Sequence, residues 1–170
     1  MRSNLMLLMA ATIWGMGFVA QRLGMDHMGP YTFNGLRFLL GAASLLPLLW
    51  WLKSRQPAGQ SEDRRLLLTG GLLAGAVLFS AASLQQVGLL YTTAAKAGFI
   101  TGLYIILVPV IGLALRHKTG ANTWVGALIA MAGLYYLSVT EEFTIGYGDL
   151  LQVIGALFWA IHLLVLDHYS

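Results

Sequence analysis

A continuous apolar stretch, Ala94–Leu115, constrains the fold of this chain more than any other feature, because it is long enough to cross a lipid bilayer. The hydrocarbon core of a bilayer is about 30 Å thick and requires roughly 20 largely apolar residues per helix. Other stretches qualify or come close, and polar or turn-forming connections separate them. The sequence predicts six spans in all: Leu5–Leu23, Tyr31–Leu52, Leu66–Leu90, Lys96–Leu115, Thr123–Val139 and Leu150–Leu166.

Composition places the chain among membrane proteins. Charged residues make up 10% of its 170 residues, whereas a soluble domain carries about 25%. The sequence therefore predicts an all-α polytopic membrane protein. The formal net charge of +3 comes mostly from the connections between spans, so it bears on topology, and no nucleic-acid partner is expected. The absence of cysteine excludes disulfides and thiolate metal sites.

Sequence signatures of enzymes are missing from the chain. It contains no His-Glu-x-x-His, no Gly-x-Ser-x-Gly, no P-loop and no cluster of metal ligands at a workable spacing. The turn Gly146-Tyr147-Gly148 is too short to form a dinucleotide-binding loop. We therefore expect no catalytic residue, no cofactor and no metal site.

The distribution of lysine and arginine predicts the orientation of the chain. Basic residues collect at the cytoplasmic ends of spans, and acidic residues contribute little to topology. If the N-terminus is cytoplasmic, only Arg22 and Lys96 lie at outer ends. The inner ends then hold the majority of the basic residues: Arg2, Lys53, Arg55, Arg64, Arg65, Arg116 and Lys118. We expect a multi-pass protein with a cytoplasmic N-terminus.

A short internal match indicates an inverted repeat. Ala11-Thr12-Ile13-Trp14 near the start resembles Ala156-Leu157-Phe158-Trp159 near the end, and each lies in the middle of a span. An odd number of spans separates the two starts, so the second copy enters the membrane from the opposite side, as in many secondary transporters. We expect residues 1–140 to form a five-helix repeat and residues 141–170 to form an external loop and the first helix of a truncated second repeat.

Arg37 is the candidate charge within the membrane. It lies about 10 Å along the second span, at 1.5 Å per residue, and an arginine at the bilayer centre costs at least about 2.5 kcal/mol. One interpretation is a counter-charge for an anionic group of a substrate. The other is a structural arginine that extends outward to water or bonds carbonyl groups and Asn34.

Four further residues at membrane depth are candidates for substrate binding, each with a structural alternative. Trp14 is either a wall of a cavity or a core aromatic residue. Gln85, beside Gln86, either faces a polar path or bonds between helices. Tyr104 either faces a cavity, because a hydroxyl at membrane depth prefers a polar partner, or serves simple helix packing. His162 is either a proton-coupling group or a neutral, hydrogen-bonded histidine.

The Ala94–Leu115 stretch also carries features that affect helix packing. Lys96 at its start is either a gating charge or an interface lysine with its ammonium in water. Gly-xxx-Gly pairs beginning at Gly71 and Gly98 mark faces where another backbone is expected to approach closely. Pro109 lacks a backbone donor, so a kink is expected near it.

Several motifs together resemble those of a known family, and the likeness covers nearly the whole chain. They are Ile13-Trp14-Gly15, Pro30 with Asn34-Gly35-Leu36-Arg37-Phe38, Thr92-Thr93-Ala94-Ala95-Lys96-Ala97-Gly98-Phe99 leading to Val108-Pro109, and Gly148-Asp149-Leu150-Leu151. Their order and spacing resemble the EamA-type transporters of the drug/metabolite transporter superfamily. The resemblance implies ten helices in two inverted five-helix repeats, which move small polar metabolites across the bacterial inner membrane, commonly as exporters.

The expected function is therefore secondary transport of small polar metabolites such as amino acids, outward and by alternating access. The cavity would be built by spans one, three, four and six, with Trp14, Arg37, Gln85, Tyr104 and His162 as candidate binding residues. The expected partners are the substrate, the lipid bilayer and the missing second repeat or a second copy of the chain. The alternative is a non-transporting membrane fragment or assembly partner that needs such a second half.

Overall fold

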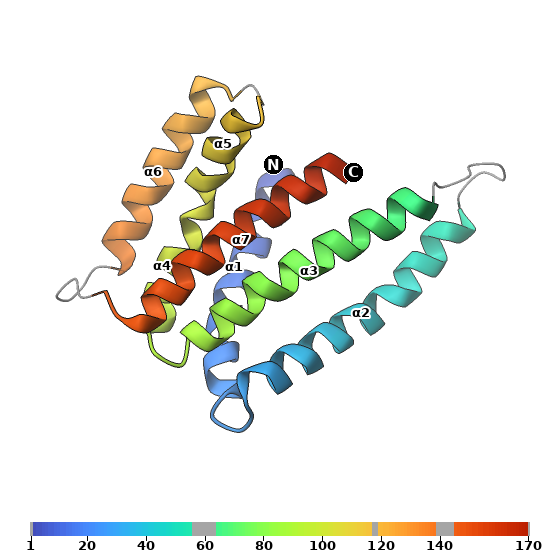
Figure 1. The fold of residues 1–170 in the computed structure, drawn as a ribbon, viewed down its shortest axis with the longest axis horizontal. Coiled ribbons are helices and arrows are strands. Elements are labelled where there is room, and N and C mark those ends of the chain that lie inside the picture. The colour runs from blue at the N-terminus through green and yellow to red at the C-terminus, as the bar shows by residue number, and fades with distance from the viewer. Residues whose placement is uncertain (1, 56–63, 117–118, 139–144, 170) are drawn as a thin grey trace.

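The computed structural model describes residues 2–55, 64–116, 119–138 and 145–169, which form seven α-helices and no strand (Figure 1). The helices are α1 (Arg2–Gly24), α2 (Pro30–Ser54), α3 (Arg64–Gly88), α4 (Ala94–Gly102), α5 (Tyr104–Ala114), α6 (Ala121–Ser138) and α7 (Tyr147–Tyr169).

Five helical stretches in the described ranges are long and apolar enough to cross a membrane: Ser3–Gly24, Pro30–Ser54, Arg64–Gly88, Ala94–Ala114 and Tyr147–Tyr169. This confirms the predicted all-α polytopic membrane fold. The expected span Thr123–Val139 corresponds to α6, which runs from Ala121 to Ser138. Val139 lies outside the described residues.

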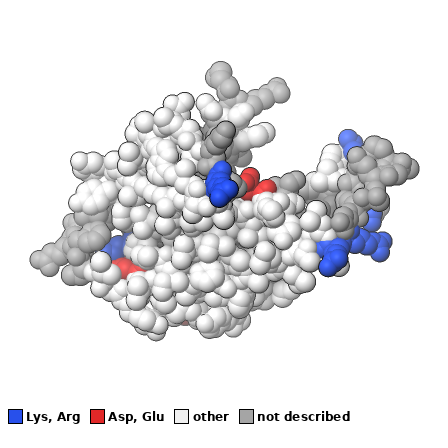
Figure 2. Space-filling model, turned by 45° about the horizontal axis from the view of Figure 1, so that its top comes forward, with Lys and Arg blue, Asp and Glu red and all other residues white. Residues whose placement is uncertain are grey.

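Successive spans run in opposite directions, so the first and last helices are antiparallel: α1 ends near the point where α2, α4 and α7 begin (Figure 1). We call this the Asp149 end of the bundle, and the opposite end, where α3 begins and α7 ends, the Arg65 end. Lysines and arginines gather where α2 ends and α3 begins (Figure 2). The antiparallel arrangement of α1 and α7 is the one that an inverted repeat requires; the division of the chain into repeats stays a prediction.

The core of the bundle is the seam between α3 and α7, which lie side by side along most of their length (Figure 1). A Cβ atom built at Gly148 would lie 2.7 Å from the carbonyl oxygen of Gly88. Small residues let helix backbones approach closely within a bilayer, where apolar side chains gain little from leaving lipid. The buried small residues of the two helices are Gly70, Ala81, Ala82 and Gly88 in α3 and Gly148, Gly155, Ala156 and Ala160 in α7.

The glycines that permit close packing are not those of the Gly-xxx-Gly pairs. A Cβ atom built at Gly71, Gly75 or Gly98 would meet no atom of the described residues within 4 Å, outside its own chain neighbours and helix backbone. The expected close approach at these positions is thus not made within the described residues. In α3 the reason is that another face, which includes Gly70 and Gly88, is turned toward α7. A Cβ atom at Gly70 would lie 2.8 Å from the ring of Tyr169.

The fourth span is interrupted at Leu103, which separates α4 from α5 and lies before the turn that precedes Pro109. At the break, Leu103 N donates to Ile100 O at 3.1 Å, a tightened turn in place of the regular α-helical bond. Gly102 precedes the break and is a poor helix former. The irregular point of this span is thus a single tightened turn at Leu103, which keeps right-handed helical backbone angles (φ −58°, ψ −21°) and ends the nine-residue α4. The kink expected near Pro109 stays a prediction.

The packing of Gly148 against Gly88 predicts a large difference between two glycine substitutions. Gly148→Ala should lower the free energy of unfolding by about 1–3 kcal/mol, because the added methyl group overlaps a backbone carbonyl that cannot easily move. Gly75→Ala is the matched control, since the same methyl group enters open space, and it should be neutral or stabilising by up to about 1 kcal/mol. Thermal unfolding of the purified protein in detergent measures both. Equal stability of the two variants would contradict the description of the seam.

Candidate functional site

A cleft of about 250 Å³ opens between α1, α2, α3 and α7. Its lining combines aromatic rings, two side-chain amides and one cation, which is the composition of a site for an amphipathic small molecule. The lining residues are Ile13, Trp14, Gly17, Phe18, Gln21, Arg37, Phe38, Gln85 and Trp159. The cleft therefore brings together Trp14, Arg37 and Gln85 of the five candidate residues.

Two tryptophans form one wall of the cleft. The rings of Trp14 and Trp159 meet edge to face, with centroids 5.7 Å apart and an interplanar angle of 62°, a geometry that aromatic pairs favour. They occupy equivalent positions in the two matching tetrads, so the two repeat-like segments contact each other here. Trp14 remains 55% exposed, which leaves much of its ring free for contact with another molecule.

Gln85 is the centre of the hydrogen bonds around the cleft. Its side-chain oxygen accepts from the indole Nε1 of Trp159 at 2.9 Å, and its Nε2 donates to Oε1 of Gln21 at 3.2 Å. The Gln21 amide in turn donates to Gly17 O at 3.0 Å. These bonds join α7, α3 and α1 through one amide that is 5% exposed, and they fix which side of Gln85 donates and which accepts.

Gln152 supports this arrangement from behind the cleft. Its Nε2 donates to the backbone oxygen of Gln85 at 2.8 Å, and its Oε1 lies 3.4 Å from the hydroxyl of Thr101. Gln152 and Trp159 lie two turns apart on one face of α7, so the side chains of both can bind Gln85 of α3. The register of α7 on α3 therefore sets the position of the Trp159 ring.

Arg37 carries the only positive charge in the cleft lining, and its guanidinium lies over the Phe38 ring, 4.9 Å from the centroid. Among the described residues it has no hydrogen-bond or ion-pair partner. Asn34, expected as a possible partner, donates to Ala82 O at 3.0 Å instead, while its own oxygen is buried without a partner in the described chain. The guanidinium is thus available to a ligand in the cleft.

Tyr104 and His162 lie outside the cleft lining. His162 Nδ1 lies 3.1 Å from Ala74 O, so that nitrogen carries a proton if the contact is a hydrogen bond. The hydroxyl of Tyr104 has no hydrogen-bond partner among the described residues. Their roles in substrate binding or coupling stay predictions.

The sequence reasoning missed Gln21, Trp159 and Gln152 as site residues. Gln21 lies seven residues after Trp14 and therefore on the same helical face, a spacing that points to it. Trp159 could have been selected from the matched tetrads, because it occupies the position of Trp14, which was already a candidate. No sequence signal singles out Gln152, because its importance depends on the α3 face that it meets.

The fold defines a multi-pass membrane protein, and comparison with known proteins then identifies the family. Residues 1–139 match the EamA-like transporter family, and the chain belongs to that family. This confirms the resemblance noted in the motifs, and the family is one of transporters rather than of enzymes.

Relatives in two organisms carry transporter names. The chain is 34% identical to an uncharacterized transporter of Archaeoglobus fulgidus over 99% of its own length and 50% of that protein. It is 30% identical to the uncharacterized transporter YetK of Bacillus subtilis over 76% of the chain and 39% of that protein, and 25% identical to YoaV of the same organism over 88% and 51%. The chain thus spans about half the length of these curated relatives. No solved structure matches it.

The hydrogen bond between Trp159 and Gln85 predicts different effects for two similar substitutions. Trp159→Phe keeps a ring against Trp14 but leaves Gln85 Oε1 without its donor, and should lower the free energy of unfolding by about 0.5–1.5 kcal/mol. Trp14→Phe removes a nitrogen that has no bond in the described chain and should cost less. Thermal unfolding of both variants checks this, and a larger effect at Trp14 would contradict the assigned hydrogen bond.

Proposed function

We propose that this chain forms one wall of the substrate path of a secondary transporter, which exports small polar metabolites such as amino acids by alternating access. The observation that carries the proposal is the unpaired guanidinium of Arg37 in a cleft that also presents indole rings and amide groups. Membership of a transporter family supports it. Cations within membrane spans commonly mark substrate or ion pathways.

The chemistry of the cleft favours a substrate with a carboxylate and a compact organic body. A guanidinium presents a planar fork of donors that matches a carboxylate bidentately. Gln21 already accepts and donates within the protein, but each amide oxygen retains a second lone pair for an ammonium or amide donor. The exposed face of Trp14 offers an apolar surface, and a cation such as an α-ammonium is attracted to an indole face.

The opposite wall of the path is proposed to come from a second helical bundle. Trp14 is largely exposed, and the chain spans about half the length of its relatives. That bundle is either the second half of a longer protein or a second copy of this chain. The same half-length match favours the alternative function, in which the chain is a non-transporting module that acts only as an assembly partner.

The membrane orientation is proposed from the basic residues of the connections. Lys53, Arg55, Arg64 and Arg65 lie at the Arg65 end of the bundle, as do the first residues of α1 (Figures 1 and 2). The positive-inside rule then places this end in the cytoplasm and the Asp149 end outside. For a bacterial protein the membrane is the inner membrane, and export is movement from the Arg65 side to the Asp149 side.

Substitution of Arg37 tests the role of the cleft directly. Arg37→Gln should weaken binding of carboxylate-containing amino acids about 10- to 100-fold, because it removes a charge-assisted hydrogen-bond donor worth about 1.5–3 kcal/mol. Uptake of a panel of radiolabelled amino acids into proteoliposomes is the measurement, with ligand-induced thermal shifts as a second readout. Arg64→Gln, at the start of α3, removes the same charge outside the cleft and should leave uptake unchanged. Uptake by the Arg37→Gln variant equal to wild type would exclude the cleft as the binding site.

The absence of cysteine allows a clean test for a second copy. Ile13→Cys, at the cleft mouth, should form a disulfide-linked or bismaleimide-linked dimer in membranes if a second copy covers the cleft. Leu40→Cys on α2, which is similarly exposed but outside the cleft lining, is the control and should stay monomeric. Absence of flux through the wild-type chain, together with absence of the cross-link in the Ile13→Cys variant, would support the non-transporting alternative.

A further inference from the structure

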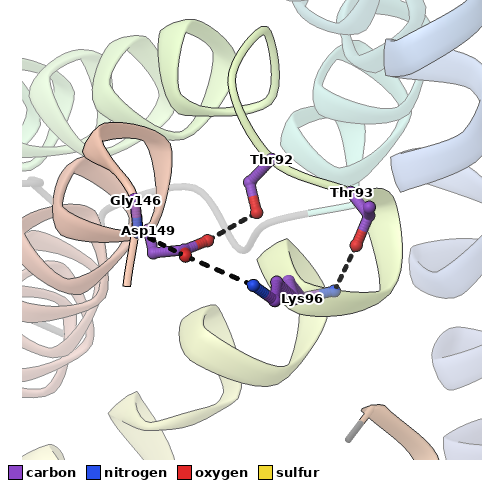
Figure 3. A network of polar contacts seen from close by, with 5 residues as sticks. All are labelled: Thr92, Thr93, Lys96, Gly146 and Asp149. Carbon is purple, nitrogen blue, oxygen red and sulfur yellow. Dashed lines mark hydrogen bonds and ion pairs between the residues drawn. The ribbon is translucent and has the colours of Figure 1, made fainter. Parts of the chain in front are cut away.

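Three groups converge on the carboxylate of Asp149 at the start of α7 (Figure 3). The Thr92 hydroxyl donates to Oδ1, the Gly146 backbone N–H donates to Oδ2 at 2.9 Å, and Lys96 Nζ lies 3.6 Å from Oδ2. The Asp149 residue is only 6% exposed, whereas the Lys96 side chain is 33% exposed. Lys96 is therefore neither an isolated interface lysine nor a buried one, but one side of a half-exposed ion pair.

The ion pair joins a short helix to a long one. The nine-residue α4 begins after Thr93, whose hydroxyl accepts the backbone N–H of Lys96 at 3.2 Å, and ends at the break at Leu103. At its first turn α4 is bound to α7 through Lys96 and Asp149. Near its last turn it is bound through Thr101 and Gln152, at the long distance of 3.4 Å. The tightened turn at Leu103, where Leu103 N donates to Ile100 O, is the point at which α4 can bend relative to α5.

The two sides of Asp149 differ in how firmly they are held. On one side, Gly148 lies against the backbone of Gly88 and Tyr91, so α7 is fixed on α3 by contacts that have no freedom to shift. The rings of Tyr91 and Tyr147 also meet edge to face, 5.3 Å apart. On the other side, the polar contacts between α4 and α7 are a half-exposed ion pair and one long hydrogen bond, beside the packing of α4 on its neighbouring helices. These polar contacts, unlike the backbone contact at Gly148, can be exchanged for water, so α4 is the element that can separate from α7 at this end.

We propose that α4 is a gate segment that hinges at Leu103 and is latched to α7 by the Lys96–Asp149 ion pair. In the latched state α4 holds Thr101 against Gln152, whose amide binds the backbone oxygen of Gln85. Release of the latch swings the start of α4 away from α7 and admits water to this polar layer. The role of α4 as a gate on a substrate path rests on the function proposed above. Opening of the ion pair between Lys96 and Asp149 can be measured without a transport assay.

Accessibility of a single cysteine in α4 tests the latch. Ala97 is fully buried and lies one turn before Thr101 on the same face of α4, so Ala97→Cys reports opening without touching the ion pair. In membranes containing the full chain, Lys96→Met and Asp149→Asn should each raise its labelling rate by a membrane-impermeant maleimide about three- to tenfold. Lys96→Arg retains the charge and should keep the rate low. The double variant should label no faster than the faster of the two single variants, because each single substitution already breaks the same ion pair.

A second cysteine separates opening of the gate from loss of the fold. Ala160→Cys lies in α7, is also fully buried, and is remote from α4 along the helix. Its labelling rate should stay at the wild-type value in every background. An unchanged rate at Ala97→Cys, or an equal rise at both cysteines, would overturn the gate. If the labelling rates change as expected but the chain shows no flux, only the transport function is refuted. If the chain shows flux but the labelling rate of Ala97→Cys does not respond to the substitutions, only the gate is refuted.

Discussion

The hydrogen bond from the Gln152 amide to the backbone oxygen of Gln85 shows what holds this bundle together. Within hydrocarbon there is no water to satisfy a side-chain amide, so a hydrogen bond to another group of the protein stabilises it. Gln152 reaches the α3 backbone only because Gly148 and Gly155 bring the two helices close: a Cβ atom at Gly155 would lie 3.6 Å from Ala81 O. Small residues and buried amides thus act together, since neither alone would fix the register of the two helices.

The register of α7 on α3 determines the geometry of the cleft through one residue, Gln85. The backbone oxygen of Gln85 belongs to the seam, while its side chain bonds Trp159 and Gln21 in the cleft. A sliding of α7 along α3 by one turn would break both attachments and move the Trp159 ring away from Trp14. The cleft is therefore a consequence of helix packing rather than an independent feature, which explains why its residues come from segments far apart in the sequence.

Hydropathy and length were sufficient to predict the helical membrane fold, because a bilayer leaves few alternatives for a backbone that must satisfy its own hydrogen bonds. The depth of polar groups selected five residues, of which the fold places Trp14, Arg37 and Gln85 in one cleft and leaves Tyr104 and His162 outside its lining. The packing contacts could not be predicted, because they depend on which helix faces meet. Gly71 and Gly75 have the same local pattern as packing glycines, yet only the opposing helix decides whether a glycine is close to it.

Lys96 and Arg37 differ in whether their charge is paired within the protein, because their surroundings differ. Lys96 has a carboxylate at 3.6 Å that is itself held by two further donors, so its charge is balanced within the protein. Arg37 has an aromatic ring beside it and no acid or hydrogen-bond acceptor in contact among the described residues. A charge in low dielectric without a balancing partner is costly. In the proposed transporter an anionic substrate supplies the missing partner, so its binding offsets the free-energy cost of the unpaired Arg37 charge. The charge of Lys96 is already paired with Asp149. In the proposed gate, Lys96 therefore acts by separating from Asp149.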